Sequence, residues 1–444
     1  MGRGVTNAWA PDPLGLRRVD RTPVAGVIAQ EIGEAGAISF RRFMELALYH
    51  PELGYYSRCV PGPDGDYVTS PELHGAFGAL ICVQFEQMWQ ILGRPNPFWL
   101  IEAGPGTGRF ARDVLETAEA AFPEFASALQ VALIERSPLL RKVQEELFAH
   151  WQNRVRWLDT DPQPSVLGPQ PSPLGRPSLP PRGGGLGRGS ESTVSGCVFA
   201  NEVLDAFPVH RVVMRAGGLQ ETWVDVEDDR FVEIEKPASV DLANHIETSS
   251  GPLPLGCFAE INLDGDPWMQ AVAGLIDRGY VLLIDYGAEA DVLYSGVHPR
   301  GTLRAYQGQV LMDDPLALPG WRDLTAHADL SALRRSASEV GLASGRSTTQ
   351  AGFLSQLGID RLLDRVDDCV SERVGQRAHR AVLKSLVAPS GLGALAVLAF
   401  AKHAPLNDLV GFGGASSPQP PEARFIWNLR VDPAQLGSIR PELV

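Results

Sequence analysis

Five short apolar runs in this chain each end in an acidic residue, and helical patterns separate most of them. The runs read FWLIE, VALIE, VRWLD, CVFANE and YVLLID. Unbroken apolar runs of this length are typical of strands that are buried on both faces of a parallel sheet. Strands that alternate with helices predict a doubly wound α/β fold, and the last apolar run, Leu395 to Lys402, is the expected closing strand.

The composition narrows the class of protein. The 444 residues carry a formal net charge of −14, and 44% of them are apolar, which is typical of a globular chain with a substantial core. The negative charge argues against a nucleic acid as partner. The cysteines are far apart and no metal-ligand spacing occurs, so we expect neither a disulfide framework nor a metal site. Without a secretion signal or an apolar stretch of about 20 residues, we expect a cytoplasmic protein with no membrane insertion.

Changes in composition divide the chain into expected units. Pro, Gly and Ser dominate residues 161–195, which cannot bury enough apolar surface to order themselves, so we expect a disordered insertion there. The other expected units are a flexible N-terminal arm (1–22), an N-terminal helical cap or lid (23–97), a main domain (98–404) with α+β insertions at 210–279 and 300–370, and a C-terminal tail (405–444).

Local patterns predict several boundaries. The spacing of apolar residues indicates helix from Val24 to Tyr49, with Ser39 as an N-cap, and again from about Pro71 to Leu92. Ser137 followed by proline is typical of a helix start. The pair Gly217-Gly218 between two alternating segments predicts the turn of a β-hairpin.

A glycine-rich turn, Gly104-Pro105-Gly106-Thr107-Gly108, follows the first strand and opens a helix. Ligands of open α/β sheets bind at this edge, beyond the carboxyl ends of the strands. The third glycine comes one residue too early for the dinucleotide fingerprint, and no Gly-Lys-Ser/Thr follows for a phosphate-binding loop. An acid followed by G-x-G-x-G is the pattern of S-adenosylmethionine-dependent methyltransferases. An ordinary strand–helix turn is the alternative.

Acidic residues at the strand ends complete the expected cofactor site. Glu102 precedes the glycine turn and can pair with the cofactor's amino group, and Glu135 ends the second strand, where it can accept hydrogen bonds from ribose hydroxyls. Asp159 ends the third strand and can approach the adenine amino group. For Glu135 and Asp159 a solvated carboxylate at the end of a strand remains the alternative.

Long motifs in this chain resemble those of the MidA-like methyltransferases. The resemblance runs from about Ser39 to Ala404 and is carried by FMELALYHPELGYYS, GDYVTSPELHGAFG, EAGPGTGRF, IERSPLLRKVQ, ANEVLDAFPVHR, VLLIDYG, GTLRAY, DPLALPGWRDLTAHADLSAL and TTQAGFLSQLGI. This chain departs from the family in its Pro/Gly-rich insertion, in Leu204 and Phe207, and in Ala288, where many members have a histidine.

The resemblance implies a class I methyltransferase fold with S-adenosylmethionine as cofactor. The family's mitochondrial relative is regarded as a protein arginine methyltransferase that supports assembly of respiratory complex I. The resemblance therefore implies a protein substrate, with a complex I subunit as a candidate, and a homodimer is left open. Two rival functions remain at this point: an assembly factor or scaffold with a vestigial cofactor pocket, and an NAD-dependent oxidoreductase.

The loop after the fourth strand is the expected catalytic region, because the end of that strand faces the methyl group in this fold. Glu202 and Asp205 are the expected catalytic carboxylates, which would hold and orient a substrate guanidinium through bidentate hydrogen bonds. Asn201 is the expected hydrogen-bond partner of the cofactor or the substrate. A structural carboxylate is the alternative for Glu202, and the N-cap of a helix is the alternative for Asp205.

A short polar segment before the sheet completes the predicted site. In the family it folds over the cofactor, so the resemblance assigns cofactor contacts to Asp66, Thr69 and Ser70. Thr69 or Ser70 as the N-cap of the following helix is the alternative.

Overall fold

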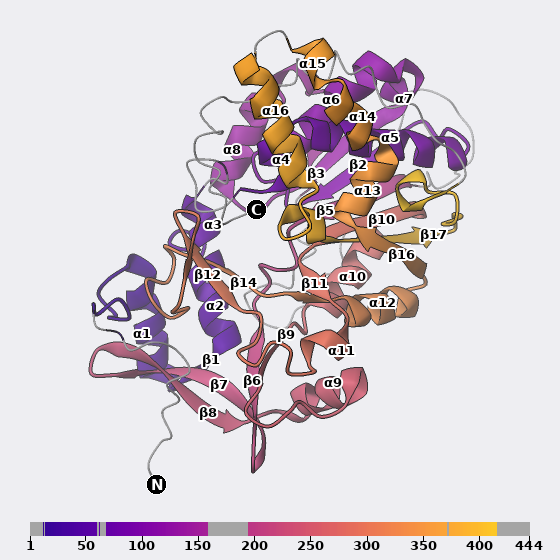
Figure 1. The fold of residues 1–444 in the computed structure, drawn as a ribbon. Helices are drawn as coiled ribbons and strands as arrows, with labels where there is room; N and C mark the ends of the chain where they lie inside the picture. The colour runs from indigo at the N-terminus through magenta and orange to yellow at the C-terminus, as the bar shows by residue number, and fades with distance from the viewer. Residues whose placement is uncertain are drawn as a thin grey trace, which may run out of the picture.

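The computed structural model describes residue 12 and residues 14–59, 62, 68–158, 194–370 and 373–414. The insertion expected at 161–195, except for its last two residues, lies outside the described residues, as do residues 415–444 of the expected tail. A seven-stranded main sheet with its helices occupies one half of the molecule, and a second sheet with the N-terminal helices forms the other half (Figure 1).

The main sheet confirms the predicted fold class. Its strand order is β16-β17-β10-β5-β2-β3-β4. Strand β17 runs antiparallel to both of its neighbours, β10 and β16, and the other pairs are parallel. The strands are β2 (Phe98–Ala103), β3 (Leu129–Ile134), β4 (Val155–Trp157), β5 (Ser195–Asn201), β10 (Arg278–Asp285), β16 (Ala343–Thr349) and β17 (Ala396–Lys402).

Helices cover both faces of this sheet, which explains why its central strands are largely apolar. One face packs against α5 (Ala76–Ile91), α6 (Arg109–Ala121), α13 (Gln350–Leu357) and α16 (Arg373–Leu386). The other face packs against α10 (Gly265–Gly274) and α12 (Leu330–Glu339). The other α-helices of this half are α4 (Ser70–Leu73), α7 (Pro123–Ala128), α8 (Pro138–Leu147), α14 (Ile359–Asp364) and α15 (Val366–Cys369).

Several helix boundaries follow the sequence signals. The side chain of Ser39 accepts a hydrogen bond from the Arg42 N–H, and that of Ser137 accepts one from the Leu140 N–H, so both predicted N-caps are confirmed. The helix predicted from Pro71 to Leu92 is instead broken into α4 and α5 by an extended residue, His74. The side chain of His74 accepts a hydrogen bond from the N–H of Ala76, which starts α5 at the break.

The second sheet grows from the insertion expected at 210–279, and its strands are β1 (Ile38–Ser39), β6 (His210–Arg215), β7 (Gly218–Glu227), β8 (Arg230–Pro237) and β9 (Phe258–Ile261). The predicted hairpin forms between β6 and β7, but its turn lies one residue earlier than predicted. Arg215 pairs with Gly218, so residues 216–217 make the turn. Gly218 has a positive φ of 108° and already belongs to the strand.

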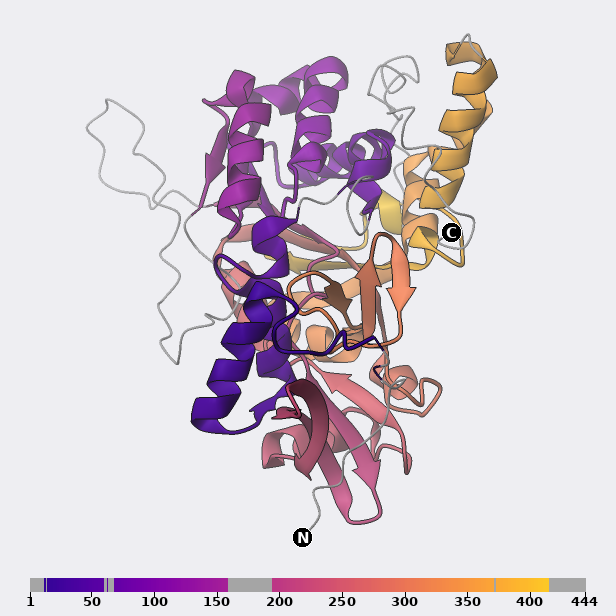
Figure 2. The same ribbon diagram turned by 90° about the vertical axis from the view of Figure 1, so that its left-hand side faces the viewer.

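The N-terminal helices α1 (Pro23–Ala35) and α2 (Phe40–Tyr49) lie beside the second sheet (Figure 2), and α3 (Tyr55–Arg58) contacts α8 of the other half. Phe40 and Phe43 of α2 share a buried cluster with Val224 and Phe231 of that sheet. The range 23–97 is therefore divided between two cores, because α5 packs on the main sheet. Part of the expected arm is also anchored, since the Phe231 N–H donates to the Arg17 carbonyl.

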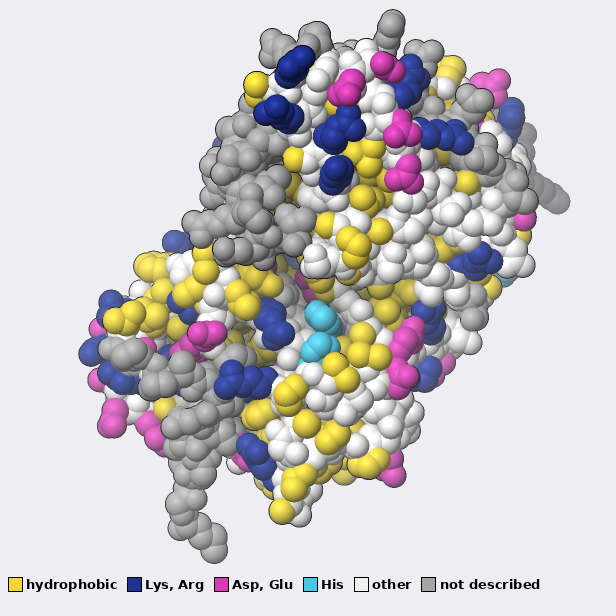
Figure 3. Space-filling model, in the orientation of Figure 1, with side chains coloured by type: hydrophobic (Ala, Val, Ile, Leu, Met, Phe, Trp, Pro, Cys, Tyr) yellow, Lys and Arg dark blue, Asp and Glu magenta, His cyan; other side chains and the backbone are white. Residues whose placement is uncertain are grey.

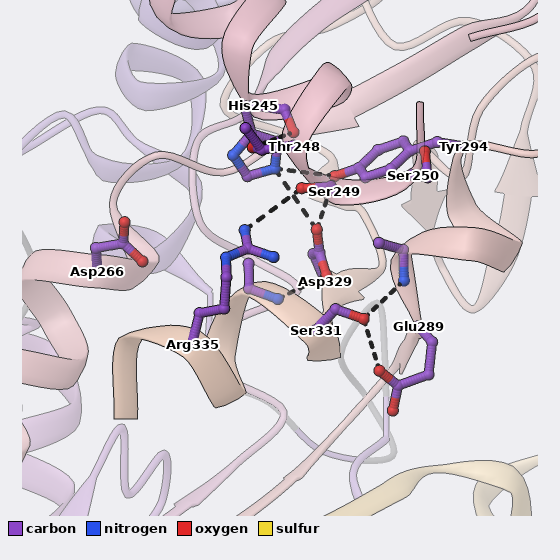
Figure 4. Close-up of polar contacts among 12 residues, drawn as sticks. His245, Thr248, Ser249, Ser250, Asp266, Glu289, Tyr294, Asp329, Ser331 and Arg335 are labelled. Carbon is purple, nitrogen blue, oxygen red and sulfur yellow. Dashed lines mark hydrogen bonds and ion pairs between the residues drawn. The ribbon is translucent and has the colours of Figure 1, made fainter. Parts of the chain in front are cut away.

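The remaining elements are small. Two of them are the helices α9 (Val240–Ser250) and α11 (Ala290–Leu293). The others are the strand pair β11 (Gly287–Ala288) and β15 (Ala328–Asp329), and a three-stranded sheet of β12 (Arg304–Gln307), β13 (Val310–Met312) and β14 (Asp323–Thr325). A polar cluster ties α9, α11 and α12 together (Figure 4). The Tyr294 hydroxyl donates to Asp329 at 3.1 Å, and His245 lies 3.5 Å from the same carboxylate. No helix within the described ranges is both long and apolar enough to span a bilayer.

Candidate active site

The glycine turn joins β2 to α6 at the carboxyl edge of the main sheet. Gly104, Gly106 and Gly108 have φ values of 66°, 54° and 85°, which favour glycine at all three positions. A Cβ at Gly104 would lie 2.8 Å from the Val203 side chain, and one at Gly108 would lie 2.8 Å from the Phe148 ring. Packing within the chain therefore explains the outer two glycines, and the middle one is held by a hydrogen bond to its carbonyl oxygen.

Glu102 sits inside β2 and is only 4% exposed. Burial raises its pKa to about 8, and the charges of Glu135 and Asp113 add to the rise. Among the described residues its Oε2 atom finds no hydrogen-bond partner. A buried oxygen without a donor is costly, so this position is built to receive a donor that the described chain does not supply.

Glu135 follows β3 and is tied to the glycine turn through one glutamine. Its carboxylate accepts hydrogen bonds from the Ser137 N–H at 2.7 Å and from Gln144 Nε2 at 3.1 Å. The same Gln144 nitrogen donates to the Gly106 carbonyl at 2.7 Å. Burial raises the pKa of Glu135 to about 7. Glu102 and Glu135 therefore flank the turn from two neighbouring strands, as the sequence predicts.

Asn201 and Glu202 stand at the end of β5. Glu202 has a φ of 52°, a strained backbone conformation for a residue with a side chain. Its carboxylate accepts hydrogen bonds from Asn201 Nδ2 at 2.9 Å and from the Ser70 N–H at 3.3 Å. Burial raises the pKa of Glu202 to about 7, and Asp285 and Asp323 add to the rise. Asn201 Oδ1 lacks a partner among the described residues, so this loop also presents an unsatisfied acceptor.

Asp205 follows in the same loop and does not cap a helix. Residues 202–209 form turns and lead directly into β6, so the alternative of an N-cap is wrong. The side chain is 6% exposed, and burial together with Asp285, Glu202 and Asp323 raises its pKa well above the ordinary value. The loop therefore holds the Asp205 carboxylate buried close to three other carboxylates.

Asp285, at the end of β10, fixes the backbone of this loop. Its carboxylate accepts hydrogen bonds from the N–H groups of Val203 at 3.0 Å, Leu204 at 2.7 Å and Tyr286 at 2.8 Å. Burial raises its pKa to about 7, although these bonds act in the opposite direction. Asp285 therefore holds the loop that carries the two expected catalytic carboxylates.

Asp323 of β14 is a member of the site that the sequence reasoning missed. It is 3% exposed, it accepts a hydrogen bond from the Tyr56 hydroxyl at 2.7 Å, and its charge acts on both Glu202 and Asp205. Tyr306 of β12 lies within the influence of Asp205 and Asp323 as well. These residues come from segments about 100 positions away, and the sequence signals for them were the motif GTLRAY, which ends at Tyr306, and the long motif DPLALPGWRDLTAHADLSAL, which contains Asp323.

Four carboxylates thus gather beyond the end of β5, from Glu202, Asp205, Asp285 and Asp323. Within the described part of the chain, the first three form no ion pair with lysine or arginine. The molecule is hollowed between its two halves, with an acidic side chain visible inside (Figure 3). Because Glu202, Asp205 and Asp285 have no cation of their own among the described residues, this site is complementary to a cationic ligand.

The predicted lid residues are only partly testable. Asp66 lies outside the described residues, as does Asp159 of the predicted adenine contact. Thr69 occupies the N-cap position of α4, but its side chain makes no capping hydrogen bond. Ser70 is fully buried, donates its hydroxyl to Gln350 at 3.1 Å and, through its N–H, contacts Glu202. Ser70 therefore connects the segment before the sheet to the carboxylate cluster.

These residues fit a nucleoside cofactor with a cationic amino group. The unpartnered Glu102 oxygen can accept a hydrogen bond from an amino group, and the Glu135 carboxylate lies just beyond the end of the neighbouring strand β3, where hydroxyl groups can reach it. The tight turn at Gly106 allows a ligand to approach the backbone.

Comparison with known proteins agrees with this chemistry. A family model for S-adenosyl-L-methionine-dependent methyltransferases, Methyltransf_28, matches residues 80–348. A Drosophila melanogaster protein named as a mitochondrial protein arginine methyltransferase NDUFAF7 homolog is 31% identical over 72% of this chain and 70% of its own length. The Danio rerio protein arginine methyltransferase NDUFAF7 is 29% identical over 75% of this chain and 76% of its own length.

A solved structure extends the similarity to three dimensions. A Burkholderia thailandensis protein crystallised with S-adenosylhomocysteine shares 27% identity and a TM-score of 0.72, over 92% of this chain and 96% of that chain. The cofactor is thus S-adenosylmethionine, which decides against the nicotinamide alternative. The expected family, fold and reaction type are confirmed, and the chain belongs to this family of S-adenosylmethionine-dependent methyltransferases.

Proposed function

We propose that this enzyme methylates an arginine side chain of a protein substrate. The observation that carries the proposal is the cluster of Glu202, Asp205, Asp285 and Asp323, which is buried beyond the end of β5 and repels its own members. A guanidinium stays protonated at ordinary pH and offers five N–H donors in a planar fork, so it can satisfy two carboxylates at once. The names of the relatives in Drosophila melanogaster and Danio rerio support the same acceptor.

Glu202 and Asp205 are the proposed substrate-binding carboxylates. Each can accept bidentate hydrogen bonds from a guanidinium, which fixes the plane of the group and directs one nitrogen. The carboxylate oxygens of Asp285 already accept hydrogen bonds from the N–H groups of Val203, Leu204 and Tyr286, so Asp285 acts as a positioning residue.

The cofactor supplies a methyl group on a positively charged sulfur. Glu102, Glu135, the turn Gly104–Gly108 and Asn201 are the proposed cofactor-binding residues, and Thr69 and Ser70 close the site from the segment before α4. The enzyme's own contribution is alignment of the reacting atoms and exclusion of water.

A proton must leave the guanidinium nitrogen that receives the methyl group. Burial raises the pKa of Glu202 to about 7 in the chain without substrate, and its carboxylate is the proposed acceptor of that proton, which it releases to water later. The step balances, because the nitrogen gains the methyl group and loses one proton, and the demethylated cofactor would leave as a neutral thioether.

The family resemblance adds a respiratory complex I subunit as a candidate substrate, and this remains a prediction, as do a homodimer and a cytoplasmic location. The proposed acceptor can be tested in cells. Proteins from cells with and without the gene, and from cells carrying Glu202→Gln, are digested and searched by mass spectrometry for mono- and dimethylarginine. At least one arginine should lose its methyl groups both without the gene and with the variant. Methylation lost only from lysine or another residue would reject arginine as the acceptor.

A further inference from the structure

The three-stranded sheet of β12, β13 and β14 connects the buried carboxylates to the surface through one row of side chains. Asp323 of β14 pairs with Tyr306 of β12, and Tyr306 pairs with Leu311 of β13. Directly paired residues of antiparallel strands place their side chains on the same face. The row Asp323–Tyr306–Leu311 therefore lies on one face of this sheet.

This face is the one that meets the carboxylate cluster. Asp323 and Tyr306 both lie within the influence of Asp205. The opposite face carries Ala305 and Leu324, which are buried in the core beneath the N-terminal helices. Leu311 thus shares its face with the site and not with the core.

Exposure increases along the row toward the outer strand. Asp323 is 3% exposed, Tyr306 is partly buried, and Leu311 is 50% exposed. Apolar side chains gather beside the hollow, over the part of the molecule where β12 and α3 lie (Figures 1 and 3). The row therefore leads from an apolar surface position to a buried carboxylate.

We propose that this row binds the substrate polypeptide, with Leu311 contacting an apolar side chain that lies near the target arginine. The inference rests on the proposed function. Adjacent strands are about 4.8 Å apart, so Leu311 and Asp323 are separated by roughly 10 Å, the length of about three extended residues. The apolar side chain should therefore lie two or three residues from the arginine.

Nine-residue peptides with a central arginine provide the test. The set places a single leucine, aspartate or alanine two or three residues from the arginine, and methyl transfer from S-adenosylmethionine gives kcat/KM for each peptide. The variants are Leu311→Asp and, as a matched control, Val310→Asp. Val310 is the neighbouring residue of β13, is 42% exposed, and points to the other face because it pairs with Gln307. Titration with S-adenosylhomocysteine checks that both variants keep the cofactor site.

The wild-type enzyme should prefer a leucine peptide over the matching aspartate peptide by about tenfold, as expected for burial of part of a leucine side chain. Leu311→Asp should remove this preference, and Val310→Asp should keep it. The proposed role of this row would be overturned by an unchanged preference for the leucine peptide in Leu311→Asp, by no such preference in the wild-type enzyme, or by no methylated peptide at all. These outcomes leave the proposed acceptor intact if cellular methylarginine still depends on the gene, whereas methylation of a residue other than arginine would reject the proposed function itself.

Discussion

Replacement of Glu202 by glutamine should stabilise the protein and at the same time impair its activity. The two hydrogen bonds that Glu202 accepts, from Asn201 Nδ2 and the Ser70 N–H, go to Oε1, and a glutamine oxygen can accept both. The substitution therefore removes a negative charge with little change in shape.

The stability gain follows from the pKa of Glu202, which burial raises from 4.5 to about 7. Ionisation of this group at pH 8 thus costs the folded state about 3 kcal/mol relative to the unfolded state. Glutamine avoids that cost. The gain should be complete above pH 7, should decrease as the pH falls from 7 to 4.5, and should vanish below 4.5, where Glu202 is protonated in both states.

The activity loss follows from the same charge. A hydrogen bond to a charged group contributes about 1.5–3 kcal/mol, so loss of the carboxylate should lower kcat/KM for an arginine substrate roughly ten- to hundredfold. Binding of S-adenosylhomocysteine should stay within about threefold of the wild type.

The assay combines thermal unfolding at pH 8 and pH 5 with methyl-transfer kinetics. Glu289→Gln is the matched control. Burial acts to raise the pKa of Glu289, but hydrogen bonds from Ser331 and Arg334 outweigh it, so the pKa is lowered. Glu289 lies beside Ser331 (Figure 4). Loss of the Glu289 charge should therefore reduce the free energy of unfolding by less than about 1 kcal/mol and leave kcat/KM unchanged. The reasoning is refuted if Glu202→Gln lowers the melting temperature at pH 8 or retains wild-type kcat/KM.

Three further predictions concern other parts of the molecule. Gly106→Val forces a branched residue to a φ of 54° and should weaken S-adenosylhomocysteine binding at least tenfold in calorimetric titration; an unchanged affinity would contradict this. Because burial raises the pKa of Glu202 to about 7, kcat/KM for a cationic substrate should increase about tenfold from pH 6 to pH 8, and a flat profile would argue against a carboxylate site. Arg211→Ala leaves the buried Glu233 without the cation 2.8 Å away and should cost about 3–5 kcal/mol in denaturant unfolding; a loss below about 1 kcal/mol would show that the pair contributes little.

The main sheet was predictable because its strands are buried on both faces. Burial on both sides makes β2, β3, β5, β10 and β17 largely continuous apolar runs, and their length of six to eight residues with flanking turn signals favours strands over buried helices. The edge strand β16, with the sequence ASGRSTT, has no such pattern and was therefore not predictable from its sequence. Polar edge strands take their place from pairing with a neighbour, which one short segment does not encode.

The positions of Glu102, the glycine turn and Glu135 were also predictable, since each is attached to a recognisable strand end, and their cofactor contacts stay a prediction. The substrate side was only half predictable. Glu202 and Asp205 follow β5 directly. Asp323 instead belongs to the three-stranded sheet, where it accepts a hydrogen bond from the Tyr56 hydroxyl, and the packing of that sheet places it near Glu202 and Asp205. Contacts between segments so distant in sequence depend on how the insertions pack, and local patterns carry no information about that.

A crystal structure with S-adenosylhomocysteine and an arginine peptide tests the central claim most directly. The account predicts that the cofactor lies against the glycine turn, and that the guanidinium lies between the cofactor's sulfur and the carboxylates of Glu202 and Asp205. A guanidinium bound elsewhere, or a sulfur that faces away from the end of β5, would contradict it.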